Sequence, residues 1–109
     1  MEVRCLRLPG GDRLAVFVAE GFPERLVGLA GLARPDAGAL LIPRCRAVHT
    51  CGMRFRLDVL FVTLEGDSVV VHDAQREVAP WRFVRASRAA RAHPALAALE
   101  LAAAAPPRQ

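Results

Sequence analysis

Cysteine and histidine side chains gather in one short stretch of this chain, and an isolated carboxylate follows them. Cys45, His49 and Cys51 have the spacing C-x3-H-x-C, which offers soft and borderline ligands to a metal ion. The same groups could instead supply a nucleophile and a base oriented by Asp58. The spacing matches no standard zinc motif, and a structural zinc requires four ligands. We therefore assign no catalytic or metal-binding residue and expect no cofactor.

Asp58 lies inside the most apolar segment of the chain, whose composition predicts a strand buried on both faces. A carboxylate in such a strand is costly unless it accepts hydrogen bonds or pairs with a cation. We expect it to cap backbone N–H groups or to pair with Arg54 or Arg56, with His49 and Thr50 in the same polar network. The candidate site, structural or ligand-contacting, comprises His49, Thr50, Cys51, Met53, Arg54 and Asp58.

Strand signals surround this site on both sides. Residues 3–8 and 13–19 flank a glycine-rich turn and predict one hairpin, and residues 57–72 predict a second. A further short strand is predicted at residues 38–42. Together these elements predict one mainly β domain, a compact barrel or sandwich of short, mostly antiparallel strands with one or two short helices.

Helical signals are fewer. Apolar spacing predicts a short helix at residues 22–32, and residues 95–105 have helical propensity although prolines bound them. The four arginines of Arg82–Arg91 recur at every third position, which on a helix would form a basic stripe. Ser87 is a candidate N-cap for a short helix at the end of that stripe.

Charge is unevenly distributed along the 109 residues, whose formal net charge is +4. Residues 1–75 are balanced, whereas residues 76–109 hold six arginines against two acidic residues. A basic surface of this kind could face an acidic partner, nucleic acid or lipid headgroups, although charge runs of this kind are usually solvated surface. Only Trp81 and Phe83 lie near the stripe as stacking groups, so nucleic acid is the less favoured partner. Trp81 is expected in the core with Met53 and Phe55.

The central stretch resembles the signature of a known family, the domain of unknown function 192 (DUF192). Residues 48–61 are similar to its variant form VHTxGMRFxLDVxF, apart from Cys51, which replaces an aromatic, and Arg56, which replaces the usual proline. The resemblance covers about residues 13–102 and implies a mainly β barrel-like or sandwich fold, with no established activity. Further similarity lies in the helix-like residues 24–29, the strand-like residues 38–42, the turn and strand at 65–70, and residues 98–101.

From these features we predict a single domain, residues 1–109, with residues 103–109 as a disordered tail. The odd cysteine count and the lack of a bilayer-length apolar run favour a cytoplasmic protein without a membrane span. We predict a binding or accessory module for a protein or small-molecule ligand, with contacts at Arg44–Arg56 and the Asp58 end of the strand. One alternative is a Cys/His-dependent enzyme or metal-binding protein centred on Cys45, His49, Cys51 and Asp58. The second alternative is nucleic-acid binding through Arg82–Arg91.

Overall fold

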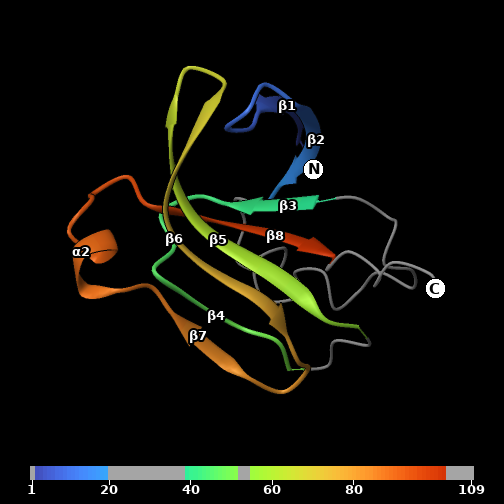
Figure 1. Ribbon diagram of the computed structural model, residues 1–109, viewed down its shortest axis with the longest axis vertical. Helices are drawn as coiled ribbons and strands as arrows, with labels where there is room; N and C mark the ends of the chain where they lie inside the picture. The colour runs from blue at the N-terminus through green and yellow to red at the C-terminus, as the bar shows by residue number, and fades with distance from the viewer. Residues whose placement is uncertain (1, 20–38, 52–54, 103–109) are drawn as a thin grey trace.

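The described part of the chain consists of eight strands and one helical turn. The structure is a computed structural model that describes residues 2–19, 39–51 and 55–102 (Figure 1). The mainly β class expected from the sequence is confirmed. In chain order the elements are β1 (Glu2–Arg7), β2 (Arg13–Val18), β3 (Ala39–Ile42), β4 (Ala47–His49), β5 (Leu57–Glu65), β6 (Ser68–Val78), β7 (Phe83–Arg85), α2 (Arg88–Arg91) and β8 (Ala97–Ala102).

Both predicted hairpins form, and glycine makes their turns. β1 pairs antiparallel with β2, and β5 pairs antiparallel with β6. Gly10, Gly11 and Gly66 have φ angles of 98°, 99° and 61°, a region of backbone conformation that glycine enters without a steric penalty. The turns therefore lie where the glycines of the sequence predicted them.

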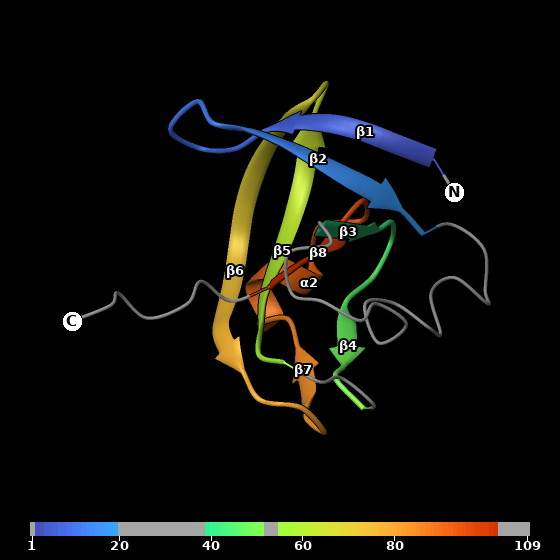
Figure 2. The ribbon, with the colours of Figure 1, turned by 90° about the vertical axis from the view of Figure 1, so that its right-hand side faces the viewer.

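Six of the strands close into a barrel in the order β1-β2-β3-β8-β5-β6 (Figure 2). β2 and β3 pair in parallel, and β8 lies between β3 and β5 with antiparallel pairing on both sides. The seam between β1 and β6 is short, since its only ladder pair among the described residues is Arg7 with Ser68. Of the two architectures that the sequence left open, the molecule adopts the barrel.

The central strands are buried on both faces because one apolar core packs against each face. Side chains alternate along a strand, so Val59 and Phe61 of β5 enter one core and Leu60 and Val62 enter the other. The second core fills the barrel with residues of β1, β2 and β6. The first core lies between the barrel and an outer layer of β4, β7 and α2. This arrangement explains why β5 is apolar at almost every position.

β4 and β7 form a separate two-stranded sheet, which we call the ribbon. It lies at the opposite end of the molecule from the β1–β2 hairpin (Figures 1 and 2). Val48 pairs with Val84, and both are buried in the first core. His49 pairs with Phe83, and both are exposed. The ribbon therefore has one face on the core and one face in solvent.

In two places the second half of the chain differs from what its local sequence pattern suggests. Arg82–Arg91 is not one helical stripe, because residues 83–85 form β7 and only Arg88–Arg91 is helical. Ser87 does cap this turn, since its hydroxyl accepts the N–H of Ala90 at 3.2 Å. Residues 97–102 form β8 despite their helical propensity, because pairing along both edges outweighs a local preference.

Glu100, on β8, is a charged residue inside the sheet. It is 3% exposed, lies between Leu40 and Val59 in the sheet, and has a polar partner. The predicted helix at 22–32 and the predicted tail at 103–109 lie outside the described residues. Across the segments that the structure describes, no helix combines the length and apolarity needed to cross a bilayer.

Candidate functional site

Thr50 organises the end of the ribbon. Its side chain is fully buried, and its Oγ1 accepts the backbone N–H of Arg82 at 2.8 Å and donates to the carbonyl of Ala79 at 2.8 Å. The main chain adds two bonds, from Thr50 N–H to Arg82 O at 2.8 Å and from Trp81 N–H to Thr50 O at 3.0 Å. We call these four bonds the Thr50 clasp. They fix residues 79–82 around one buried side chain.

The clasp holds Trp81 in a left-handed conformation, with φ of 64°. Such a conformation is uncommon for a bulky residue and persists only where surrounding bonds determine it. Trp81 is 69% exposed and Phe83 is 72% exposed, so two large rings project into solvent beside the clasp. The expectation that Trp81 lies in the core is wrong. Phe55, named with it, is partly buried against the first core.

His49 and Cys51 flank Thr50 and are both exposed. His49 Nδ1 accepts the backbone N–H of Cys51 at 3.3 Å, and the ring lies across from Phe83 in the ribbon register. Of the sequence-predicted site, His49, Thr50 and Cys51 therefore lie together at the end of the ribbon. Met53 and Arg54 lie outside the described residues.

Asp58 belongs to a different polar cluster, on the barrel. Its side chain is 14% exposed; Oδ1 accepts the N–H of Glu77 at 2.9 Å and Oδ2 lies 3.4 Å from Arg76 Nη1. The register shifts by one residue here, so Asp58 caps an N–H that the β-bulge removes from the ladder. The predicted backbone cap is confirmed. The expected link to Thr50 is wrong, because the hydrogen bonds of Thr50 run to residues 79–82.

Arg56, proposed as the ion-pair partner of Asp58, has a related role. Its Nη1 donates to the carbonyl of Glu77 at 3.1 Å, while Arg76 is the described cation next to Asp58. Glu77 itself has a φ of 53°. Both peptide groups of this strained residue are therefore held by side chains from β5 and the residue before it, which gives Asp58 a structural role in shaping the bulge.

The thiols do not converge on His49. Cys45 is buried in the first core and its Sγ lies 3.0 Å from the carbonyl of Ala47, whereas Cys51 is exposed. Among the described residues, no group of three His, Cys, Asp or Glu side chains lies close enough to hold a metal ion. The arrangement pairs a histidine with a neighbouring backbone N–H rather than with a nucleophile.

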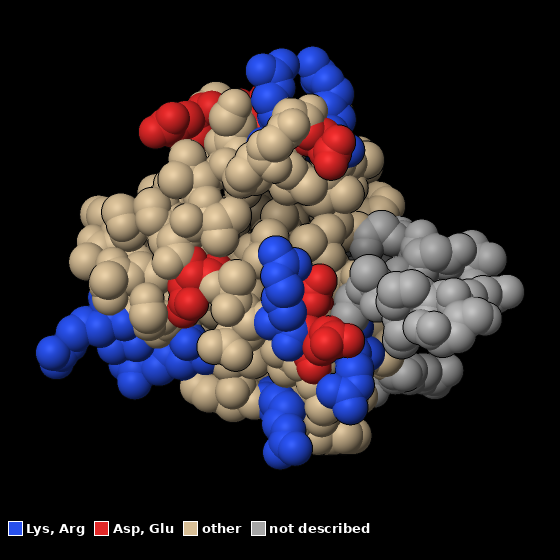
Figure 3. Space-filling view, viewed as in Figure 1, with Lys and Arg blue, Asp and Glu red and all other residues tan. Residues whose placement is uncertain are grey.

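Arginine dominates the surface around the ribbon. Residues 43–51 and 79–95 contain no aspartate or glutamate. In Figure 3, acidic and basic side chains mix over the β5–β6 hairpin, whereas arginines gather at the lower left, over α2 and β7. The fold thus joins two basic segments that are separated in sequence by the acidic hairpin. The six basic residues of these two segments are Arg44, Arg46, Arg82, Arg85, Arg88 and Arg91.

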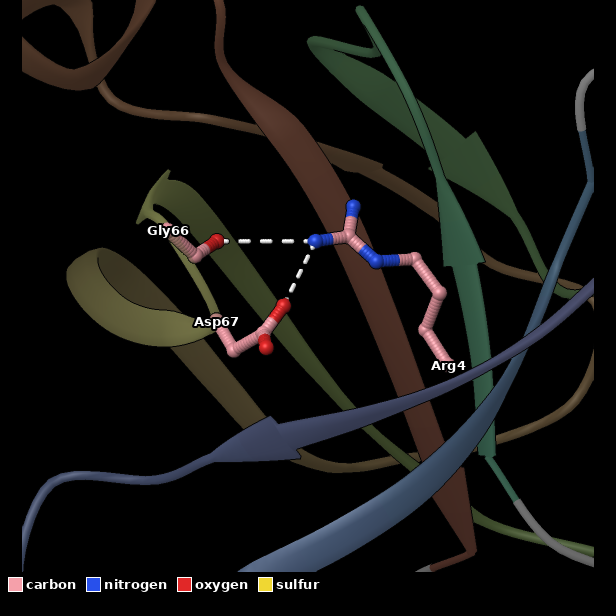
Figure 4. Close-up of polar contacts among 3 residues, drawn as sticks. All are labelled: Arg4, Gly66 and Asp67. Carbon is pink, nitrogen blue, oxygen red and sulfur yellow. Dashed lines mark hydrogen bonds and ion pairs between the residues drawn. The ribbon is translucent and has the colours of Figure 1, made fainter.

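A concave feature lies at the mouth of the barrel, with a volume of about 390 Å³. Its apolar wall includes Val18 and Leu41, and Arg4 lies at its edge. Arg4 Nη2 reaches across the seam to Asp67 Oδ1 at 2.8 Å and to the carbonyl of Gly66 at 3.5 Å (Figure 4). The guanidinium is thus engaged in bridging β1 to the β5–β6 turn, so we assign it to barrel closure.

Comparison with known proteins identifies the family. The profile of DUF192, described as an uncharacterized ACR, matches residues 6–106, nearly the whole chain. The chain belongs to the DUF192 family. Comparison with functionally curated proteins gives no match.

Two solved structures share the DUF192 fold seen here. A protein of unknown function from Novosphingobium aromaticivorans DSM 12444 is 20% identical with a TM-score of 0.66, covering 91% of this chain and 71% of its own. A putative transcription regulator from Sinorhizobium meliloti 1021 is 21% identical with a TM-score of 0.66, covering 93% of this chain and 78% of its own. At these identities the similarity establishes the fold.

The sequence pattern of this DUF192 chain indicated some of the residues that meet at the end of the ribbon and not others. His49, Thr50 and Cys51 were selected, but Trp81 and Phe83 were not, although the structure places them beside the clasp. β4 and β7 are three residues each and pair across more than thirty positions of chain, so no local pattern marks their contact. An aromatic-arginine alternation at residues 81–83 was the one available signal.

Proposed function

We propose that this protein is a non-catalytic binding module that docks an anionic partner on the exposed face of the ribbon. We call this surface, together with the exposed segment that leads into β7, the aromatic–arginine face and define it by His49, Phe83 and Arg85 of the ribbon and by Trp81 and Arg82 of that segment. The observation that carries the proposal is the exposure of two large rings, 69% and 72%, on a backbone fixed by the clasp. Aromatic and arginine side chains are the groups that most often supply binding energy at protein interfaces.

The charge of the face indicates the sign of the partner. The two segments that build it and its surroundings hold six arginines and no carboxylate. Local potential of one sign raises the association rate and the affinity of oppositely charged ligands. The description of the Sinorhizobium meliloti structure as a putative transcription regulator is in keeping with a binding role.

A binding role also agrees with the chemistry of the thiols. Catalysis by a Cys/His pair would need a thiol activated by a neighbouring base and an orienting group. Cys45 instead points its sulfur toward a backbone carbonyl inside the first core. All three cysteines are free, which supports a cytoplasmic location as part of this proposal.

Retention on heparin, a polyanion without bases, tests the proposal. Wild-type protein should bind and elute at raised salt, because exposed guanidinium groups release counterions on binding. The double variant Arg82→Gln/Arg85→Gln should elute at clearly lower salt. The matched control is Arg7→Gln/Arg13→Gln, which removes two exposed arginines of the β1–β2 hairpin and leaves the same net charge. Equal shifts for the two double variants, or no retention of the wild type, would refute the assignment of the face.

A further inference from the structure

We infer that the anionic partner is single-stranded nucleic acid, whose bases stack on Trp81 and Phe83 while its phosphates contact Arg82 and Arg85. This inference rests on the proposed function and names its ligand class. Proteins that bind single strands combine a positively charged track with aromatic side chains on which bases stack. Both components occur here within five consecutive residues, 81–85.

The rings are presented on a rigid support. Trp81 N–H donates to Thr50 O at 3.0 Å, and the next N–H, of Arg82, donates to Thr50 Oγ1 at 2.8 Å. Phe83 pairs in register with His49, which adds a third exposed ring across the ribbon. Because the backbone is already ordered, stacking a base costs little additional conformational entropy. A preformed platform of this kind suits a flexible ligand.

Two carboxylates of the β5–β6 hairpin accept backbone N–H groups. Asp73 accepts the N–H of Ser87 at 2.7 Å through Oδ2 and the N–H of Ala74 at 2.8 Å through Oδ1. Asp58 accepts the N–H of Glu77 and lies beside Arg76. These acidic groups satisfy backbone donors of β6 and of the N-terminus of α2. The two segments that carry the ribbon arginines contain no carboxylate that would repel a phosphate backbone.

The alternation of rings and cations distinguishes the ligand from other polyanions. A single strand offers both flat bases and phosphates, so it can satisfy Trp81 and Phe83 as well as the arginines between and beside them. A duplex keeps the faces of its bases inside the stack, and recognition of unpaired segments relies on bases that are splayed out. An acidic peptide would neutralise the arginines but offer few planar groups to the two rings.

Trp81 is the only tryptophan in the chain, so its fluorescence reports on this face alone. Titration with oligo(dT) or oligo(U) of about ten nucleotides, within the range bound by single-strand modules, should quench Trp81 saturably. The affinity should fall with salt, with a log–log slope of about −0.7 per phosphate contacted. Arg82→Gln/Arg85→Gln should reduce the magnitude of this slope by about 1.4 if each arginine contacts one phosphate. Arg7→Gln/Arg13→Gln should leave it unchanged.

Ring substitutions test the stacking itself. Phe83→Ala followed by Trp81 quenching, and Trp81→Ala followed by anisotropy of a labelled oligonucleotide, should each weaken binding about five-fold to a hundred-fold. Trp81→Phe should recover part of the lost affinity because it keeps a stacking ring. Far-ultraviolet circular dichroism of each variant distinguishes lost stacking from lost structure.

Probes without bases separate this inference from the proposed function. Inorganic polyphosphate or poly-glutamate that binds as tightly as the oligonucleotide, with equal loss in the arginine variants, would overturn the nucleic-acid assignment and leave the proposed function standing. A blue shift of Trp81 with phosphatidylserine vesicles, without quenching by oligonucleotides, would also overturn it and indicate a lipid surface. Failure to bind heparin, polyphosphate and oligonucleotides would refute both.

Discussion

The barrel and the ribbon meet the same backbone requirement with different residues. In the barrel, the positive φ angles among the described residues belong to Gly10, Gly11 and Gly66 at the hairpin turns and to Glu77, with φ of 53°, at the bulge of β6. In the segments that lead into the two ribbon strands they belong to Arg44 and Trp81, with φ of 49° and 64°. A side chain in this region costs about 1–2 kcal/mol relative to glycine. Side chains kept despite that cost point to a role beyond turning the chain.

Charge separates the same two regions. Residues 2–19 and 55–78, which form most of the barrel, hold five arginines and seven acidic residues. Residues 43–51 and 79–95, which form the ribbon and α2, hold six arginines and no acidic residue. The barrel is thus a mildly acidic scaffold that carries a basic, aromatic surface at one end. Substitutions that weaken one region and leave the other intact test this division between scaffold and surface.

Loss of the clasp should have the largest effect. Thr50→Val keeps the shape of the side chain but leaves Arg82 N–H and Ala79 C=O without their hydroxyl partner. We expect a loss of about 2–4 kcal/mol in the free energy of unfolding, measured by urea denaturation. Thr50→Ser should retain most of the stability because the hydroxyl remains.

The control for this change is Thr63→Val, on β5. Thr63 Oγ1 makes a 2.8 Å hydrogen bond to the His72 side chain rather than to the main chain, and the residue is partly exposed. We expect a loss of about 1 kcal/mol. If both valine variants lowered the free energy of unfolding by the same amount, the clasp would stabilise the fold no more than an ordinary side-chain hydrogen bond.

Asp58 provides the equivalent test on the barrel. Asp58→Ala removes the acceptor for the Glu77 N–H and should cost about 2–3 kcal/mol. Asp58→Asn keeps an acceptor and loses only the ion pair with Arg76, whose side chain is 69% exposed, so it should cost less than about 1 kcal/mol. Urea denaturation measures both. Unchanged heparin retention in both variants would confirm that this cluster lies outside the docking face. Lost retention would mean that Asp58 and its partners contribute to that face.

The sequence predicted the barrel better than the ribbon, for physical reasons. β5 is apolar on both faces and the hairpin turns carry glycine, so local composition determines these elements. β8 was ambiguous because Ala and Leu favour helix in isolation, and only pairing with two distant strands overrides this. The period of three at Arg82–Arg91 suggested a helix where a strand and a capped turn follow each other.

The candidate site was predicted only where its residues are adjacent in sequence. His49, Thr50 and Cys51 are consecutive, and their polar and sulfur-bearing side chains directly precede the apolar segment that contains Asp58. Trp81 joins them through a backbone hydrogen bond from its N–H to Thr50 O, a contact that depends on the packing of the ribbon against the barrel. Asp58 was correctly expected to cap a backbone N–H, but its partner on β6 depends on a bulge with no sequence marker.

Substitutions at Trp81 separate backbone strain from ring function. Glycine relieves the positive φ, whereas alanine does not, and both remove a ring that buries little surface. Trp81→Gly should therefore be more stable than Trp81→Ala by about 1 kcal/mol, after allowance for the greater entropy of unfolded glycine. Both should lose oligonucleotide binding to a similar extent. Equal stability of the two variants in urea would show that the clasp imposes no strain on residue 81.

The smallest effect is expected at the barrel seam. Arg4 bridges to Asp67 at 2.8 Å, but the two side chains are 35% and 71% exposed, and surface pairs contribute little. Arg4→Gln should cost about 0.5 kcal/mol in low salt and less in high salt. The main-chain bond from Arg7 N to Asp67 O at 2.7 Å, which the substitution leaves intact, should keep the seam closed. Arg13→Gln serves as a control for lost charge, and a loss above about 2 kcal/mol for Arg4→Gln alone would mean that side-chain charge closes the barrel. Such a result would mean that a charged pair closes the barrel, whereas the neutral hydroxyl and main-chain bonds of Thr50 fix the end of the ribbon.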